Sequence, residues 1–461
     1  MSQQQHTEPV NLLILGASGD LTSRLLLPGL GTLLEAEPHR TVRILGAAVD
    51  PMSEQDWRTR VSQALAGGGC PDSRTELAMA HTSYRQADLL DEATVKELIS
   101  DLGDGPSVVY FALPPAITEK VCAVLEKTGI PPNVRLALEK PFGHDLESAR
   151  RLNEQLHRFA SEDQIYRVDH FLGRSGVLNI LGFRFANRVF EPVWRADHVE
   201  SVDIIFDEAL ALEGRARYYD NAGALIDMIQ SHLLLILTMV AMEDMARLDA
   251  LELRDLMTHV LRSVSLWNDD PVESSLRARY TSGQTNGKWV PDYAAEDGVD
   301  PDRMTETLAE VTVRINTERW AGVPFRLRSG KALGTDDRRI VVNFKPVGHV
   351  PTGFGDAPKP NRLTIALSPE RLILDIATNG VGDKFELEQS SLVSQLGESP
   401  VRPYGEILAH IMDGDQLLSV RGDTAEELWR VLTPVVDAWR RGEVPLEEYP
   451  AGTRGPVTWR Y

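Results

Sequence analysis

The chain has 461 residues, 42% of them hydrophobic and 25% charged, and a formal net charge of −20 at pH 7. This length exceeds what one core usually supports and favours two domains, and the acidic balance excludes a nucleic-acid binder with a basic face. It does not exclude a phosphorylated small molecule, because a few local cations can hold one phosphate.

The composition also favours a soluble, cytoplasmic protein. The two cysteines, Cys70 and Cys122, are too few for a disulfide framework, which indicates a reducing compartment. The N-terminal residues MSQQQHTEP are polar and do not resemble a secretory signal. The longest apolar run, residues 233–242, is about half the length of a membrane span.

The first third of the chain alternates apolar runs with amphipathic stretches. The apolar runs predict four buried strands, at residues 10–16, 41–49, 107–115 and 133–143. Helical patterns lie between them, for example at residues 92–102 and 117–129. Strands that alternate with helices predict a doubly wound parallel α/β sheet, which we expect over residues 1–172.

The pattern changes after about residue 175. Five alternating stretches predict half-exposed antiparallel strands, at residues 198–209, 306–317, 338–347, 362–369 and 371–378. Residues 221–244 predict one long apolar helix, with Asp220 as its N-cap. We therefore expect a larger α+β domain over residues 173–461, with helices and a mainly antiparallel sheet.

A glycine turn follows the first predicted strand. In LLILGASGDLTSRL, Gly16 and Gly19 lie between a strand and a helix, where bare backbone amides can bind a pyrophosphate. The G-x-x-G spacing lacks the third glycine of the full fingerprint, so a simple tight turn is the alternative. Its place at the start of a parallel domain favours a dinucleotide site.

A second segment of interest is YRVDHFLGRS, residues 166–175. Its neighbours Asp169 and His170 are not expected to pair, because adjacent side chains diverge on a strand and on a helix. They are therefore expected to serve different purposes.

Nine segments resemble the glucose-6-phosphate dehydrogenase family, in the same order and from residue 11 to near the end. They are GASGDLT, EKPFG, RVDHFLGR, RFANRVFEPVW, AGALIDMIQSHLL, MTETLAEV, FRLRSGKAL, GDQLLSVRGDTAEELWRVLTPVVDAW and YPAGTRGP. The resemblance implies a Rossmann domain followed by a β+α domain. It also implies oxidation of C1 of a hexose 6-phosphate to the lactone with NADP or NAD, the first step of the pentose phosphate pathway. The family forms homodimers or homotetramers and uses the exposed sheet of the second domain as an interface.

Oxidation of a hemiacetal needs a base for the anomeric hydroxyl proton and an acceptor for the hydride that leaves C1. A histidine suits the base because it titrates near neutral pH, and a carboxylate can orient it. The resemblance places the base at His232 and the orienting carboxylate at Asp169. It assigns His170 to the phosphate of the substrate. Taken alone, His232 in an apolar helix could be a core residue and Asp169 a helix cap.

Other functional residues follow from the resemblance alone. The predicted substrate-binding residues are Lys140, His170, Arg174, Glu208, Asp227 and Lys331. The predicted cofactor-binding residues are Gly16, Ala17, Ser18, Gly19, Asp20, Leu21, Asp50 and Lys140. The bond from Lys140 to Pro141 is a candidate cis peptide. Asp227 and His232 are about 140° apart on an ideal helix, so they flank the sugar or the helix departs from ideal geometry.

The chain departs from the family pattern R-I-D-H-Y-L-G-K-E at three positions. Phe171 replaces a tyrosine and loses a hydroxyl whose bond to a phosphate is worth about 1.5–3 kcal/mol. Arg174 replaces a lysine, which keeps the charge but changes its geometry, and Ser175 replaces a glutamate. A dehydrogenase for another sugar or sugar phosphate is therefore the alternative function.

A further departure concerns the cofactor. NADP-using members carry an arginine after the second strand, where this chain has Val49 followed by Asp50. A carboxylate there suits a free ribose 2′-hydroxyl and repels a 2′-phosphate, so we expect NAD to be used at least as well as NADP. In the alternative, Asp50 caps the next helix or faces solvent, and Arg24 or another cation binds the phosphate.

The sequence disfavours a non-catalytic sensor and gives no indication of a metal site. A non-catalytic sensor of a sugar phosphate or nucleotide is expected to have lost the base or its partner, and this chain has both His232 and Asp169. The eleven histidines are scattered without ligand spacing such as H-E-x-x-H, so no metal site is indicated.

Overall fold

The computed structural model describes residues 8–459 except 213, 215, 355–357, 383, 384 and 398, and the side chain of residue 217 is not described. The chain forms two compact units. One comprises Met1–Ser175, Met245–Asp255 and Ser399–Trp429, and the other comprises Gly176–Asp244, Leu256–Glu398 and Arg430–Tyr461. The division into domains at residue 172 stays a prediction.

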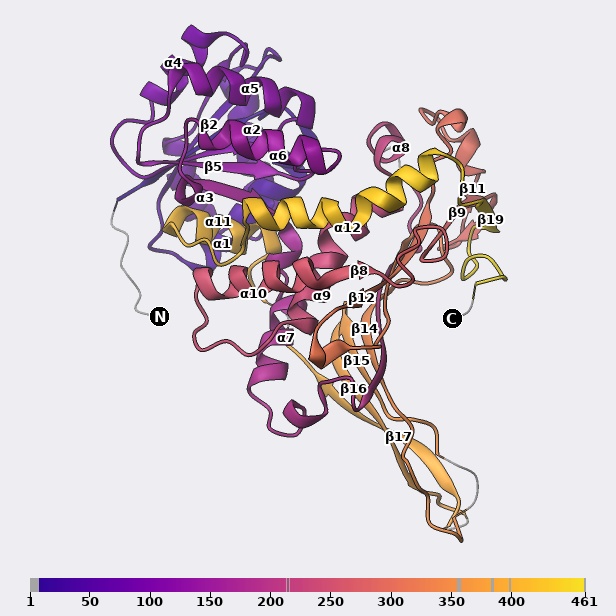
Figure 1. Cartoon of the computed structure of the whole chain (residues 1–461). Coiled ribbons are helices and arrows are strands. Elements are labelled where there is room, and N and C mark those ends of the chain that lie inside the picture. The colour runs from indigo at the N-terminus through magenta and orange to yellow at the C-terminus, as the bar shows by residue number, and fades with distance from the viewer. Residues whose placement is uncertain are drawn as a thin grey trace. The chain divides into compact units, whose positions relative to one another are not determined.

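A seven-stranded sheet forms the centre of the first unit (Figure 1). Its strands are β1 (Val10–Leu15), β2 (Val42–Ala48), β3 (Ser83–Gln86), β4 (Ser107–Phe111), β5 (Val134–Glu139), β6 (Ile165–Val168) and β18 (Ser419–Val420). They follow the order β18-β6-β5-β4-β1-β2-β3, and every neighbouring pair is parallel except β18 with β6. This order of the six parallel strands is that of the Rossmann fold, which confirms the predicted doubly wound sheet.

Helices cover the parallel sheet. They are α1 (Leu27–Ala36), α2 (Glu54–Gly67), α3 (Asp72–Ala80), α4 (Glu92–Ser100), α5 (Pro115–Thr128), α6 (Leu146–His157) and α11 (Pro403–Asp413), with the short η1 (Thr22–Leu26), η2 (Glu162–Gln164) and η3 (His170–Gly173). All six residues of β1 are buried, as expected for a parallel strand with helices on both faces. The carboxyl ends of β1 and β4 form the point where the strand order reverses, the usual ligand site of such sheets.

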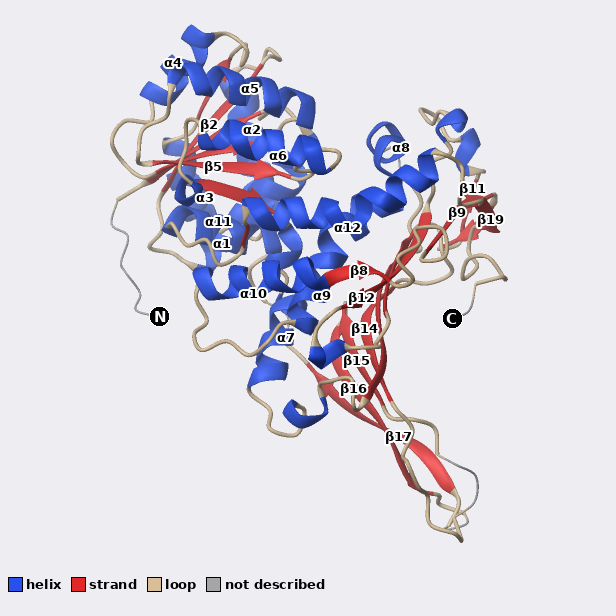
Figure 2. Cartoon of the chain, viewed as in Figure 1, coloured by secondary structure: helices blue, strands red, loops and turns tan. Residues whose placement is uncertain are grey.

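The second unit is built on a larger sheet, seen in red in Figure 2. Its strands are β7 (Val199–Asp207), β8 (Val264–Leu266), β9 (Ser275–Thr281), β12 (Leu308–Ile315), β13 (Phe325–Gly330), β14 (Asp337–Phe344), β15 (Arg362–Leu367), β16 (Glu370–Asn379), β17 (Leu387–Gln395) and β19 (Leu446–Pro450). The order is β17-β16-β15-β14-β7-β13-β12-β9-β19, with β8 paired to β12. Neighbours are antiparallel except β7 with β13 and β9 with β19, which confirms the mainly antiparallel prediction. β10 (Gly283–Thr285) and β11 (Lys288–Val290) form a separate hairpin.

The helices of the second unit include the long apolar one. They are α7 (Ser175–Phe185), α8 (Ala216–Ala224), η5 (Leu225–Leu233) and α9 (Leu234–Ala241), with the short η4 (Glu191–Val193), η6 (Tyr293–Ala295), η7 (Pro301–Arg303) and η8 (Glu318–Trp320). α10 (Ala250–Ser263) and α12 (Gly422–Arg440) contain residues of both units. Among the described residues, one helical segment, Tyr218–Ala241, has the length and apolar composition needed to cross a membrane. However, 89% of its most apolar window is buried inside the protein.

The predicted N-cap of this long helix is wrong. Asp220 lies inside α8, which begins earlier than expected, at Ala216. The Asp220 carboxylate instead accepts hydrogen bonds from the hydroxyl of Tyr293, at 2.8 Å, and from the backbone N–H of Asp300, at 3.0 Å. Its role is therefore to fix the segment that contains η6 and η7.

Candidate active site

The glycine turn lies at the switch point of the first unit, directly after β1. Gly16 has a φ of 84°, and a Cβ at this position would lie 2.3 Å from the carbonyl oxygen of Ala112, so the close turn requires glycine. The predicted cofactor-binding residues that follow it lead into the helix that contains η1. A bare backbone turn at the start of a helix fits the pyrophosphate of a dinucleotide.

Asp50 lies beside the glycine turn. It follows β2, and its carboxylate accepts a hydrogen bond of 2.5 Å from the hydroxyl of Ser18 in the glycine turn. The alternative in which Asp50 caps the next helix is wrong, because Ser53 caps α2 through a bond from the N–H of Asp56. Sequence reasoning named Arg24 as a possible cation but missed Arg60, which donates to the carbonyl oxygen of Ser18 at 2.6 Å.

Lys140 follows β5, and its bond to Pro141 is cis, as the sequence suggested. The residue before it, Glu139, is a half-buried acid that the sequence did not single out. The hydroxyls of Tyr110 and Tyr404 both donate to its carboxylate. Burial raises the pKa of Glu139 to about 7, and the nearby charges of Lys140 and Asp169 act on it in opposite directions.

Asp169 and His170 lie where β6 ends, with a carboxylate oxygen of Asp169 and a ring nitrogen of His170 within 4.8 Å of each other. Asp169 is fully buried, and its carboxylate caps η3 by accepting from the N–H of Phe171 at 3.0 Å. The His170 ring is half-buried and stacks on Tyr404, with ring centroids 5.3 Å apart and planes at 14°. The Arg174 guanidinium lies 4.4 Å from the centroid of the Phe171 ring, so the phenyl group supports this cation.

In the second unit, Asp227 and His232 both lie on η5, which is a π-helix. In a π-helix the hydrogen bonds run from residue i to i+5, so two residues five apart lie one turn apart on the same face. The helix therefore departs from ideal α geometry, which decides between the two alternatives. His232 is 2% exposed, and the Asp227 carboxylate accepts from the hydroxyl of Tyr218 at 3.2 Å.

Glu208 and Lys331 form an ion pair, with 2.7 Å between the Lys331 Nζ and a carboxylate oxygen of Glu208. They meet because each directly follows one of two parallel neighbours, β7 and β13. Arg338, which the sequence analysis did not identify, contacts the other oxygen of Glu208 at 3.2 Å. The Lys331 ammonium also lies 5.2 Å from the centroid of the Tyr219 ring.

The structure thus gathers the predicted residues into sets. The first unit holds the glycine turn with Asp50, and also Lys140, Asp169, His170 and Arg174. The second unit holds Asp227 with His232 on one helix face, and Glu208 with Lys331 at two strand ends. A paired acid and lysine can bind sugar hydroxyls as acceptor and donor, and a buried histidine can act as a base.

Known proteins resemble the chain over nearly its whole length. Residues 13–179 match the NAD binding domain of glucose-6-phosphate dehydrogenase, and residues 181–460 match its C-terminal domain. The glucose-6-phosphate 1-dehydrogenase of Treponema pallidum is 36% identical over 478 residues, covering 97% of this chain and 92% of the relative. That of Gluconobacter oxydans is 34% identical over 475 residues, covering 99% and 96%.

Solved structures agree with these matches. The glucose-6-phosphate 1-dehydrogenase of Mycobacterium avium has a TM-score of 0.85 and 32% identity, covering 97% of this chain and 95% of that one. A glucose-6-phosphate dehydrogenase in complex with its substrate glucose-6-phosphate has a TM-score of 0.89 and 30% identity, covering 99% and 97%.

Proposed function

The chain belongs to the glucose-6-phosphate dehydrogenase family, and we propose how its residues divide the work of the reaction. The protein is an oxidoreductase that oxidises glucose 6-phosphate with NAD(P)+ to 6-phosphogluconolactone, the first step of the pentose phosphate pathway. The observation that carries this function is the match of both halves of the chain to one enzyme family.

In our proposal His232 is the catalytic base. Its imidazole takes the proton of the anomeric hydroxyl as the O–H bond breaks and the C1–O bond gains double-bond character. The nicotinamide cofactor, when bound, accepts the hydride that leaves C1. Asp169 orients the imidazole and stabilises its charged form, as the carboxylate does in related triads.

The remaining assignments concern substrate binding. His170 and Arg174 bind the phosphate, and the ring of Phe171 supports Arg174 in place of donating a hydroxyl. Lys140 and Lys331 donate to sugar oxygens, while Glu208 and Asp227 accept from sugar hydroxyls. The Glu208–Lys331 ion pair supports this division, since it presents an acceptor and a donor side by side.

The cofactor preference belongs to the same proposal. The enzyme uses NAD at least as well as NADP, because the Asp50 carboxylate, held by Ser18, disfavours a 2′-phosphate. Arg60 supports continued use of NADP, since its guanidinium lies beside the same turn.

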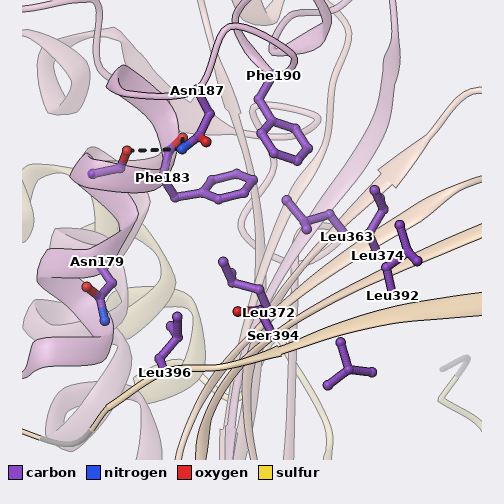
Figure 3. Close-up of a pocket in the computed structure, with 12 residues that line it drawn as sticks. Asn179, Phe183, Asn187, Phe190, Leu363, Leu372, Leu374, Leu392, Ser394 and Leu396 are labelled. Carbon is purple, nitrogen blue, oxygen red and sulfur yellow. Dashed lines mark hydrogen bonds between the residues drawn. The ribbon is translucent and has the colours of Figure 1, made fainter.

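We also propose that the enzyme is a cytoplasmic homodimer or a tetramer built from such dimers. The edge strand β17 exposes Leu392 (58%) and Val393 (53%). These side chains border a groove of about 440 Å³ between α7 and strands β15–β17, which Figure 3 shows. An exposed apolar edge is the kind of surface that a second copy covers. Cys70 and Cys122 are both buried free thiols, which suits a reducing compartment.

Initial rates with glucose 6-phosphate against NAD and NADP, followed by the absorbance of the reduced nicotinamide, test the function. Turnover with this substrate, well above that with other hexose phosphates, is the expected outcome. A clear preference for a different sugar or sugar phosphate would favour the alternative function and direct attention to Phe171 and Arg174.

A further inference from the structure

The start of the π-helix η5 is capped by a residue far away in the sequence. Ala224 precedes η5 and provides no side-chain cap. The backbone N–H of Leu225, the first residue of η5, donates instead to the carboxylate of Glu306 at 2.9 Å. The backbone carbonyl of Glu306 also accepts from the N–H of Ala224 at 3.3 Å. Glu306 thus holds two successive amides at the point where α8 ends.

Gly223 makes room for this cap. It has a φ of 65° and a ψ of 177°, which interrupts the helix between α8 and η5. A Cβ on Gly223 would lie 2.3 Å from a carboxylate oxygen of Glu306. A side chain here would therefore strain the backbone and also displace the carboxylate from Leu225.

Burial of an ionised carboxylate at this position would destabilise the folded protein. Glu306 is 7% exposed, and burial raises the pKa of its carboxyl to about 7, with a smaller opposing effect from the charge of Arg277. A helix start usually takes a short polar residue of its own chain segment as cap, without burying a charge. The π-helix is a rare geometry that is frequently found at functional sites, and a contact that fixes its first turn helps to maintain it.

We propose that Glu306 is a positioning residue, whose carboxylate anchors the first turn of η5 and thereby keeps Asp227 and His232 on one helix face. If η5 relaxed to an α-helix, these two side chains would lie about 140° apart. The inference rests on the proposed function in which His232 is the base. Glu306 acts through the helix and touches neither the substrate nor the cofactor.

The experiment compares Glu306→Ala, Glu306→Gln and Gly223→Ala with the parent enzyme. Glutamine keeps a carbonyl oxygen for the Leu225 amide, whereas alanine removes the acceptor and Gly223→Ala displaces it. We expect kcat to fall about 10- to 100-fold in the two alanine variants, as for a small misplacement of a catalytic group. We expect Glu306→Gln to stay within about threefold of the parent, and the KM for the dinucleotide to stay unchanged in all three.

Glu310→Gln is the matched control, because it removes a half-buried acid of β12 that lies near Arg326 and Arg328. Amide hydrogen exchange over residues 225–233 provides a readout that does not depend on activity. Faster exchange there in Glu306→Ala, without a change of unfolding midpoint that explains the rate loss, supports the inference. A kcat of Glu306→Ala near that of the parent, or equal losses in the alanine and glutamine variants, overturns it. If His232→Asn keeps full turnover, the base assignment fails, and the exchange data still report on the cap.

Discussion

At the scale of single residues, Glu208 and Lys331 meet although they are 123 positions apart. Each is the first residue after a strand, and because β7 and β13 are parallel neighbours, both leave the sheet at the same edge. The resemblance to the family implied both residues. It did not imply Arg338, which comes from the adjacent strand β14 and contacts the same carboxylate.

The assignment of His232 predicts a specific loss on substitution. His232→Asn is expected to lower kcat by about 10³-fold, within the usual range for removal of a general base, with a small change in the KM for glucose 6-phosphate. Asp169→Asn keeps the cap of η3, since the new amide oxygen can accept from the N–H of Phe171. Its loss of kcat is therefore expected to be smaller than that of His232→Asn. Because Asp169 acts through His232, the double variant is expected to be no slower than His232→Asn alone.

Initial-rate kinetics on all four proteins check this prediction, with the exposed His81→Asn as the matched control. Additive losses in the double variant would mean that Asp169 has an independent role. Retained turnover in His232→Asn would mean that another group is the base.

The cofactor proposal predicts opposite effects of two substitutions. Asp50→Asn removes one charge but keeps an acceptor for the Ser18 hydroxyl, so we expect the ratio of kcat/KM for NADP to that for NAD to rise about tenfold. Arg60→Met is expected to lower the same ratio, because it removes the cation beside the turn. Saturation kinetics with both cofactors measure the ratio. If neither substitution changed this ratio of kcat/KM values, the ribose 2′-position of the cofactor would lie away from Asp50 and Arg60.

At the scale of elements, apolar patterns predicted the longer strands of the first unit and failed for its short ones. The four predicted strands of the first domain correspond to β1, β2, β4 and β5, all of them mostly buried. β3 has four residues, half-buried or exposed, and gives no apolar signal. β6 also has four residues, one of them the charged but fully buried Arg167. The short length of β3 and β6, together with the buried charge of Arg167 in β6, therefore explains why the apolar pattern missed these two strands.

The π-helix was outside the reach of local sequence patterns. The cap at Leu225 comes from Glu306, 81 positions later, so no nearby residue signals it. The same holds for the half-buried acid Glu139, whose partner Tyr404 lies on α11. The spacing of Asp227 and His232 raised the question of a non-ideal helix, but only the folded structure could answer it.

The exposed edge strand predicts the oligomeric state. Leu392→Asp together with Val393→Asp is expected to shift the protein from dimer to monomer, because a desolvated carboxylate opposes burial of the edge. Light scattering after size-exclusion chromatography measures the mass. Leu251→Asp, which changes a side chain of α10 that is 66% exposed, is the control and is expected to keep the parent mass. A mass that remains dimeric in the double variant would place the interface elsewhere.

At the scale of the whole molecule, the excess of acidic residues coexists with a half-buried acid in the first unit, Glu139, and a buried one in the second, Glu306. Burial raises the pKa of Glu139 in the first unit and of Glu306 in the second, each from 4.5 to about 7. Between these values the folded protein binds protons that the unfolded chain releases. The contribution of each group to stability is therefore most favourable below about pH 4.5 and is lost as the pH rises through 7.

This linkage predicts that Glu139→Gln gains stability relative to the parent as the pH rises from 5 to 8. The upper bound of the gain is about 3 kcal/mol, since one pKa unit corresponds to about 1.4 kcal/mol. Urea unfolding midpoints at several pH values measure it. Glu443→Gln is the control, because Arg441 lowers the pKa of that exposed acid, which is therefore ionised from pH 5 to 8, so the difference between this variant and the parent is expected to stay constant. A constant difference between Glu139→Gln and the parent would mean that Glu139 keeps its charge throughout this range, with the two tyrosine hydroxyls offsetting its burial.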